Sequence, residues 1–167
     1  MTEATKNKTP ESIEVFFSYS REDEELRKKL TAHLSALKRE KVITAWHDLE
    51  ISAGTERDEE IEKRLNSARV ILLLISADFI NSEDNWQRDV KRAMERHKAG
   101  EARVIPVLVR ECDWEGTPFS KLEPLPSNGK AIGRPDNDEA FTEVNRIRNY
   151  YLNLSYLMLV MEAAILH

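Results

Sequence analysis

The stretch Val70-Ile71-Leu72-Leu73-Leu74-Ile75 is aliphatic at every position. Because its side chains do not alternate between apolar and polar, both faces of this strand need a cover, as in a parallel sheet with helices on both sides. Residues 104–109 form a second such run, in which Pro106 favours a place near the sheet edge. Two shorter runs, 13–17 and 42–46, complete a set of four predicted strands.

Amphipathic helices are predicted between these strands, because apolar residues recur there at intervals of three and four. They are Leu26, Leu30, Leu34 and Leu37 in the first helix, Ile61, Leu65 and Ala68 in the second, and Trp86, Val90, Ala93 and His97 in the third. Strand and helix alternation predicts a doubly wound α/β fold, a flavodoxin-like three-layer sandwich with a mostly parallel five-stranded sheet. The fifth strand is predicted as a short edge strand at 130–132.

Length and composition exclude several classes of protein. A chain of 167 residues argues for one domain. A net charge of −5 counts against a nucleic-acid partner held through phosphate contacts. The single cysteine, Cys112, excludes an intrachain disulfide, and the four histidines lack metal-ligand spacing, so no metal site is predicted. The five glycines form no phosphate-binding motif, and the first dozen residues lack a signal peptide's apolar stretch, which predicts a cytoplasmic protein.

The two ends of the chain differ from its centre. Residues 1–11 are polar and predict a flexible tail before a domain at 12–149, whose last helix is expected to begin near Asp136 or Asp138. Residues 150–167 form a mostly apolar helix or extension. That helix either packs on the sheet or joins copies of the chain, whereas a membrane span is disfavoured because it would fall short of ~20 residues and would contain Glu162.

Polar and aromatic residues follow the predicted strands, where parallel sheets bind ligands. Ser18-Tyr19-Ser20 follows the first strand, Trp46-His47-Asp48 ends the second, and Ser76-Ala77-Asp78 follows the third. The first segment lacks the carboxylates that would bind Mg²⁺ in a phosphoacceptor receiver domain, which excludes that class. The acidic run 22–25 and the basic run 27–29 are interpreted as a solvated helix face with charge pairs.

Four segments in order resemble the sequence boxes of Toll/interleukin-1 receptor (TIR) domains, bacterial ones above all. Phe16-Phe17-Ser18-Tyr19-Ser20 resembles the first box, and residues 46–54 look like the second strand and the BB loop with its turn glycine. Residues 72–79 are similar to the third strand, and 104–107 followed by Asp113-Trp114 to the fourth strand and its exit. The resemblance implies a role in signalling or defence.

The resemblance also implies an activity, because catalytic TIR domains cleave the nicotinamide–ribose bond of NAD⁺ with one glutamate. Asp89 stands at that position in this chain. NAD⁺ is then a substrate, with no further cofactor, and the expected partners are other TIR domains, including copies of this chain. The implied substrate-binding residues are Phe17, Ser18, Tyr19, Ser20, Trp46, Asp48 and Trp86. The implied BB-loop contacts are Leu49, Glu50, Ile51, Ser52, Ala53 and Gly54.

Three functions stay open at the level of sequence: an NAD⁺ glycohydrolase, a non-catalytic TIR interaction module, and a nucleoside-processing enzyme on a similar sheet. Each site residue also has a structural alternative. Asp89 could pair with Arg92 or complement a helix dipole, and Ser20 could cap the first helix. Trp46 could close the core, and Asp48 could fold the BB loop through an Asx turn.

Overall fold

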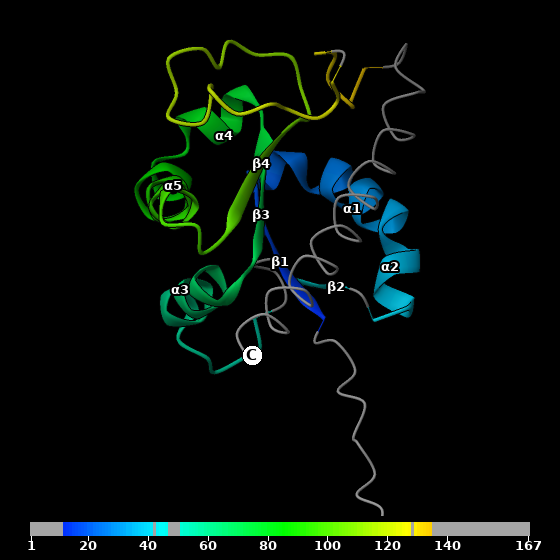
Figure 1. Ribbon diagram of the computed structural model, residues 1–167, viewed down its shortest axis with the longest axis vertical. Helices are drawn as coiled ribbons and strands as arrows, with labels where there is room; N and C mark the ends of the chain where they lie inside the picture. Colours follow the sequence, from blue (N-terminus) through cyan, green and yellow to red (C-terminus); the bar gives the residue numbers. More distant parts are fainter. Residues whose placement is uncertain (1–11, 42, 47–50, 128, 135–167) are drawn as a thin grey trace, which may run out of the picture.

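A computed structural model describes residues 12–41, 43–46, 51–127 and 129–134 of the chain. Its sheet has the order β2-β1-β3-β4, and every pair of neighbouring strands is parallel. The strands are β1 (Ile13–Ser18), β2 (Ile43–Trp46), β3 (Val70–Ile75) and β4 (Arg103–Leu108), and their carboxyl ends lie towards the top of Figure 1. The predicted parallel α/β sandwich is therefore confirmed.

Strand β3 is an interior strand, as its unbroken aliphatic sequence predicts. It pairs with β1 on one side and with β4 on the other, and all of its residues are buried. Burying each of its large side chains stabilises the fold by roughly 1.5–3 kcal/mol. The strand therefore separates two cores, one on each face of the sheet.

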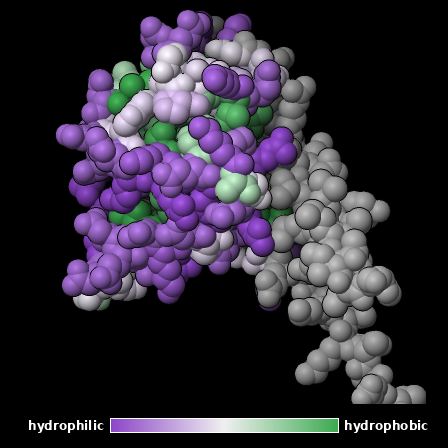
Figure 2. All heavy atoms as spheres, turned by 60° about the vertical axis from the view of Figure 1, so that its left-hand side comes forward, coloured by the Kyte–Doolittle hydropathy of each residue, from purple (hydrophilic) through white to green (hydrophobic). Residues whose placement is uncertain are grey.

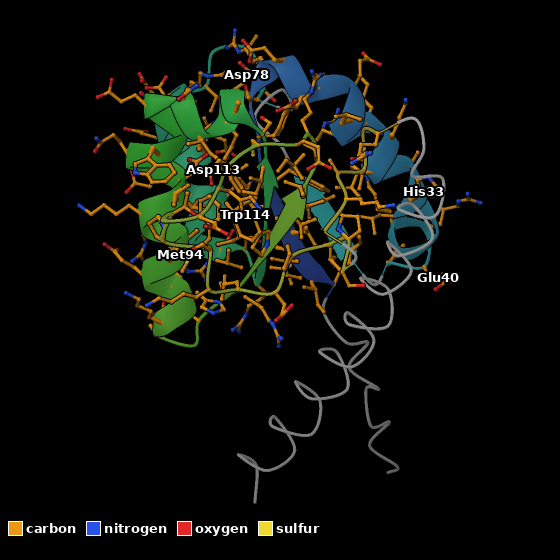
Figure 3. The ribbon with its side chains drawn as sticks, turned by 90° about the horizontal axis from the view of Figure 1, so that it is seen from above. His33, Glu40, Asp78, Met94, Asp113 and Trp114 are labelled. Carbon is orange, nitrogen blue, oxygen red and sulfur yellow. The ribbon has the colours of Figure 1, made fainter. Side chains whose placement is uncertain are left out.

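Helices cover both faces of the sheet. They are η1 (Arg21–Asp23), α1 (Glu24–His33), α2 (Ser35–Arg39), α3 (Arg57–Ser67), α4 (Ala77–Asn81), the π-helix η3 (Asn85–Val90) and α5 (Lys91–Lys98). Helices α1 and α2 lie on one side, and α3 and α5 on the other (Figures 1 and 3). Leu30 and Leu34 join the core on the first side, whereas Ile61 and Ala93 join the core on the second. The surface on the α3 and α5 side is mostly hydrophilic (Figure 2).

The outer edge of β4 differs from the prediction. Within the described residues the sheet has four strands, and 130–132 is not a strand. Instead Leu125 makes a single parallel bridge to Val107, in which its N–H donates to Pro106 O at 2.9 Å and its carbonyl accepts from Leu108 N at 2.7 Å. Pro124 and Pro126 flank Leu125, and the pairing with β4 is a single bridge.

The predicted helices are confirmed in place but are shorter or less regular than their patterns. The first helix divides at Leu34 into α1 and α2. The segment after β3 continues as α4, where Phe79 N donates to Ser76 Oγ at 3.1 Å, an N-cap that the sequence reading did not predict. The third helix opens as a π-helix, which hydrophobic spacing alone does not reveal.

The charged run at the start of α1 is less solvated than predicted. Asp23 is fully buried, and Arg27 is buried while its Nη2 contacts Glu24 Oε1 at 2.6 Å. The guanidinium of Arg27 also lies 5.8 Å from the ring centre of Tyr19. The predicted charge pair between Lys28 and Glu25 is, in contrast, exposed to solvent. The acidic run therefore contributes a buried side chain to the carboxyl end of the sheet.

The predictions for the tails at 1–11 and 150–167, and for a helix from Asp136 or Asp138, lie outside the described residues. Among the helices that are described, none is long and apolar enough to cross a membrane.

Candidate functional site

A polar cleft of about 620 Å³ lies at the carboxyl ends of β1 and β3, between α3 and α4. Its volume is within the range of about 300–1,000 Å³ that is usual for small-molecule sites. Asp78 of α4, which is labelled in Figure 3, is one of its residues. The cleft is lined by Tyr19, Ser20, Arg21, Glu22, Arg57, Asp58, Asp78, Asn81, Ser82, Asp84, Asn85 and Arg88.

Asp89 lies directly behind this cleft and is 2% exposed. Ser18 Oγ, at the end of β1, donates a hydrogen bond of 2.7 Å to Asp89 Oδ2. Arg88 Nε donates to the other carboxylate oxygen, Oδ1, at 2.8 Å. Asp89 does not itself line the cleft, whereas Arg88 does. The arginine therefore stands between the buried carboxylate and the space that a ligand would fill.

The π-helix η3 explains why Asp89 faces β1. Asn85 and Asp89 are both buried in it, and both hydrogen-bond to the end of β1. Asn85 Nδ2 donates to the carbonyl oxygen of Tyr19 at 3.2 Å. Single π-turns are frequent at functional sites because their wider turn changes which side chains face inward. Asn85 is a site residue that the sequence analysis missed.

Arg88 connects this carboxylate to the neighbouring helix. Its Nη1 lies 3.5 Å from Asp58 Oδ1 in α3, across the cleft wall. Burial lowers the pKa of Arg88, but the hydrogen bond and charge of Asp89, with the charges of Asp58 and Asp84, outweigh burial and raise it above its ordinary value. Arg88 is therefore fully charged at neutral pH. It was also missed, because an arginine in a helix full of charges has no distinguishing pattern.

The predicted site residues divide into two groups. Tyr19 and Ser20 line the cleft, and Ser18 contacts Asp89 beneath it. Phe17 does not face the cleft, since it is buried in the core on the α1 side of the sheet. Trp86 points elsewhere too: its ring lies edge-on to Phe119, with the ring centres 6.0 Å apart. Trp86 packs partly against the core on the α3 and α5 side, as its place in the predicted apolar stripe indicates.

Two structural alternatives from the sequence are wrong. Ser20 does not cap the first helix with its side chain, because its hydroxyl hydrogen-bonds to the Glu22 carboxylate. Asp89 pairs with Arg88, and Arg92 donates instead to Asn66 Oδ1 at 2.7 Å.

The predicted BB loop is described only from Ile51 onward. Ile51 packs partly against the core, and Ser52, Ala53 and Gly54 are exposed. Gly54 has a φ of 84°, a left-handed conformation that favours glycine, which fits the expected turn. The side chain of Trp46 and the residues Asp48, Leu49 and Glu50 lie outside the described part.

A second buried carboxylate was also missed. Ser76 Oγ donates to Asp23 Oδ2, and Arg110 Nε lies 2.7 Å from Asp23 Oδ1 without the geometry of a hydrogen bond. Burial and then the nearby charge of Asp78 raise the pKa of Asp23, and the Ser76 hydrogen bond and the Arg110 charge offset this only in part. These three residues come from the segments after β1, β3 and β4. They hold the rim of the sheet together but do not line the cleft.

The sequence model of the TIR domain family matches residues 15–143. This chain belongs to the TIR domain family. The match includes most of β1, the other three strands and every residue that lines the cleft. The predicted family is therefore confirmed.

The chain is similar to a curated protein and to solved structures. An uncharacterised protein, y4lF, of Sinorhizobium fredii (strain NBRC 101917 / NGR234) is 51% identical over 131 residues. The match covers 78% of this chain and 41% of that protein, so the chain spans less than half of the relative's length. The crystal structure of the RPS4 and RRS1 TIR domain heterodimer matches 87% of this chain and 99% of its own, with 18% identity and a TM-score of 0.51, which confirms the fold.

A further TIR structure, from the activated Roq1 resistosome that recognises the effector XopQ, has 28% identity. That match covers 57% of each chain with a TM-score of 0.46.

Proposed function

We propose that this TIR domain cleaves the nicotinamide–ribose bond of NAD⁺ and acts in bacterial signalling or defence. The observation that carries the proposal is the position of Asp89. Asp89, which the family resemblance places at the position of the catalytic glutamate, is held by Ser18 of β1 directly behind a ligand-sized polar cleft. The cytoplasm, where a single unpaired cysteine is usual, is the proposed setting.

The chemistry needs a negative charge beside the ribose. As the bond breaks, nicotinamide leaves with the bonding electron pair, and positive charge develops on the ribosyl carbon. Asp89 would stabilise that charge, the electrostatic contribution that is usually the largest in such sites. Water then adds to the ribosyl carbon and releases one proton. The products of this reaction are nicotinamide and ADP-ribose.

Access to Asp89 requires a movement of Arg88. The carboxylate is 2% exposed and both of its oxygens are engaged, so a substrate reaches it only after Arg88 turns towards solvent. Arg88 is itself 29% exposed, which leaves it room to turn. We propose that the phosphates of the substrate draw Arg88 away, since an arginine binds phosphate oxygens well.

Self-association is part of the same proposal. We propose that a second TIR domain docks through the exposed BB-loop residues Ser52, Ala53 and Gly54. The similarity to a TIR heterodimer supports this, because there two TIR domains bind one another. The activity should then rise with protein concentration more steeply than in direct proportion.

A second candidate function is a non-catalytic TIR module that only recruits partners. The observation that favours it is the burial of Asp89, whose carboxylate is bonded to Ser18 and Arg88. An aspartate also reaches about 1.5 Å less far than a glutamate, and a misplacement of that size can lower a rate about 10²-fold. In that case Asp89 is a structural residue.

An incubation with NAD⁺ separates the two functions. Free nicotinamide is measured for the wild-type chain and for Asp89→Ala, with Lys91→Ala on the exposed face of α5 as the control. The proposal expects release by the wild type and by the control, and loss of it in Asp89→Ala. No release at any protein concentration supports the recruiting module, and release that survives Asp89→Ala would show that another carboxylate is used.

A further inference from the structure

A groove of about 480 Å³ lies along the outer surface of α1 and α2. Four of its seven lining residues are cationic, and none of the seven is acidic. A groove of one charge on two neighbouring helices is suited to a partner of the opposite charge. It is lined by Arg27, Lys28, Thr31, Ala32, Ser35, Lys38 and Arg39.

The cations at the α2 end of this groove are the ones available to a partner. Arg27 and Lys28 of α1 already pair with glutamates of the same helix. Lys38 and Arg39, in the last turn of α2, are exposed and belong to no ion pair among the described residues. Glu40 follows them in the chain but does not line the groove.

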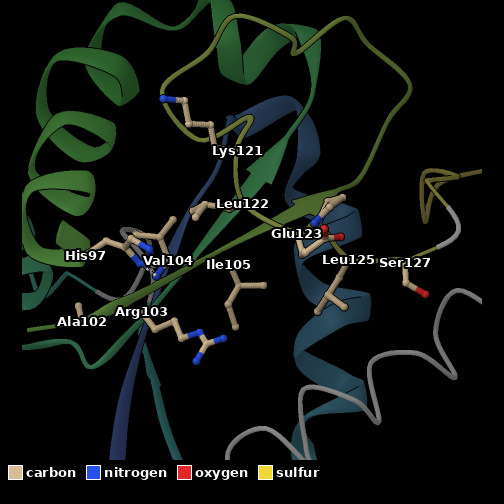
Figure 4. Close-up of a pocket in the computed structure, with 11 residues that line it drawn as sticks. His97, Ala102, Arg103, Val104, Ile105, Lys121, Leu122, Glu123, Leu125 and Ser127 are labelled. Carbon is tan, nitrogen blue, oxygen red and sulfur yellow. Dashed lines mark hydrogen bonds between the residues drawn. The ribbon is translucent and has the colours of Figure 1, made fainter. Parts of the chain in front are cut away.

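The cations at the outer edge of β4 do not form a comparable surface. Arg103 and Lys121 line a cavity there, but their side chains extend to opposite sides of it (Figure 4). Glu123 also lines this cavity. The groove on α1 and α2 is therefore the stronger candidate for a charged interface.

The exposed surface at the start of α3 has the opposite charge. Glu59 and Glu62 are three positions apart, so they lie on one face of the helix. Both are exposed, and no ion pair among the described residues includes them. The side chain of Asp58 beside them is 88% exposed. The exposed charged residues of this acidic surface are Glu56, Arg57, Asp58, Glu59, Glu62 and Lys63, and four of the six are acidic.

The groove and the acidic surface lie on opposite sides of the sheet, with α1 and α2 on one side and α3 on the other (Figures 1 and 3). They can therefore pair between two copies of the chain but not within one copy. Such a contact is heterologous, since each copy contributes a different surface. The exposed BB-loop residues 52–54 lead into α3, so the acidic surface adjoins the residues proposed for self-association.

We propose that the groove on α1 and α2 binds the acidic surface of α3 of a second copy of this chain, with Lys38 and Arg39 facing Glu59 and Glu62. The inference rests on the self-association proposed above and names the surface that receives the second copy. Each copy has a net charge of −5, which opposes association. At physiological salt, charges more than about 8 Å apart are largely screened, so the opposite charges in direct contact outweigh this repulsion.

The test measures the self-association of the full-length protein by analytical ultracentrifugation over a range of concentrations. One variant carries Lys38→Glu with Arg39→Glu, and the other carries Glu59→Lys with Glu62→Lys. Each should raise the dissociation constant about tenfold or more, because like charges then face one another. An equimolar mixture of the two should associate again, because each variant keeps the surface that the other lacks. Both variants remain net negative, so general attraction between them does not explain this recovery.

Two controls separate this contact from other effects of charge. Lys91→Glu with Lys98→Glu makes the same change of charge on the exposed surface of α5 and should leave the dissociation constant unchanged. Circular dichroism checks that each variant is folded. The wild type needs no substitution for a further measurement, since raising the salt from about 0.05 M to about 0.5 M should weaken its association.

The outcomes distinguish this inference from the self-association on which it rests. A wild type that associates equally at both salt concentrations, variants that associate as tightly as the control, or a mixture that does not recover would each overturn the α1–α3 contact and leave the BB-loop contact standing. A wild type that stays monomeric at every concentration would overturn both. Binding of polyglutamate to the groove of such a monomer would assign the groove to a different acidic partner.

Discussion

Two buried aspartates lie at the carboxyl end of the sheet, and each is held by one serine and one arginine. Asp23 contacts Ser76 and Arg110, and Asp89 contacts Ser18 and Arg88. The difference lies in what else the arginine does. Arg110 also donates to the Glu22 carbonyl at 3.2 Å, which ties the segment after β4 to the start of α1. Arg88 instead lines the cleft.

A serine, an aspartate and an arginine therefore have different roles in the two sets, because the two arginines contact different parts of the molecule. At Asp23 the three side chains join segments that follow three different strands, and none of the three lines the cleft. At Asp89 the arginine that bonds to the carboxylate also lines a ligand-sized space. The first set is therefore interpreted as structural and the second as the candidate catalytic set.

Arg88→Ala should have the largest effect on stability, a loss of about 3 kcal/mol. The substitution leaves the Asp89 carboxylate buried without its counter-ion, and partial exposure of Arg88 places the loss at the low end for a buried pair. Urea unfolding measures the effect against Lys91→Ala, an exposed neighbour in α5. Equal midpoints for the two variants would mean that Arg88 does not hold the carboxylate.

Arg110→Ala should cost less, about 1–2 kcal/mol, although Asp23 is the more deeply buried of the two carboxylates. The pKa of Asp23 is already raised by burial, so its side chain can take up a proton when the arginine is lost. The same urea experiment gives the value. A loss greater than that of Arg88→Ala would contradict the assigned difference between the two sets.

The raised pKa of Asp23 also predicts a pH dependence. The folded state binds the Asp23 proton more tightly than the unfolded state, where an aspartate titrates near about 3.9. The carboxyl's contribution to stability is therefore fully present below that value and is lost as the pH rises through the folded pKa. Stability curves of wild type and Asp23→Asn should diverge in favour of the wild type as the pH falls. Parallel curves from pH 7 to about pH 4 would show that the pKa is not raised.

Ser20→Ala should have the smallest effect, with no measurable change in the urea midpoint. The hydroxyl contacts an exposed glutamate and does not cap the helix. A clear loss of stability in this variant would indicate that Ser20 caps the first helix, as the sequence predicts.

The sheet could be predicted from sequence because its signal is local. The run Val70–Ile75 needs cover on both faces, and this requirement alone makes it an interior strand. The positions of the helices could be predicted for the same reason, because the spacing of their apolar residues is also a local signal. The edge at Leu125 could not be predicted, because a single bridge between two prolines has no periodic pattern.

The candidate site could be predicted only where the family resemblance supplied it. Ser18 and Asp89 are separated by 71 positions, and Ser76 and Asp23 by 53, so no local pattern connects them. Asn85 hydrogen-bonds to the end of β1 and Trp86 contacts Phe119 instead, in a π-helix that apolar spacing does not reveal. Charged residues in a charge-rich helix look solvated in sequence, which concealed both Arg88 and Asp23.

The most direct test of the account replaces each buried carboxylate with its isosteric amide and measures nicotinamide released from NAD⁺. Asp89→Asn and Asp23→Asn are compared with the wild type at equal concentrations of folded protein. We predict that Asp89→Asn loses about 10²-fold or more of the activity, whereas Asp23→Asn keeps it. Equal losses in the two variants, or full activity in Asp89→Asn, would contradict the claim that Asp89 alone of the two is catalytic.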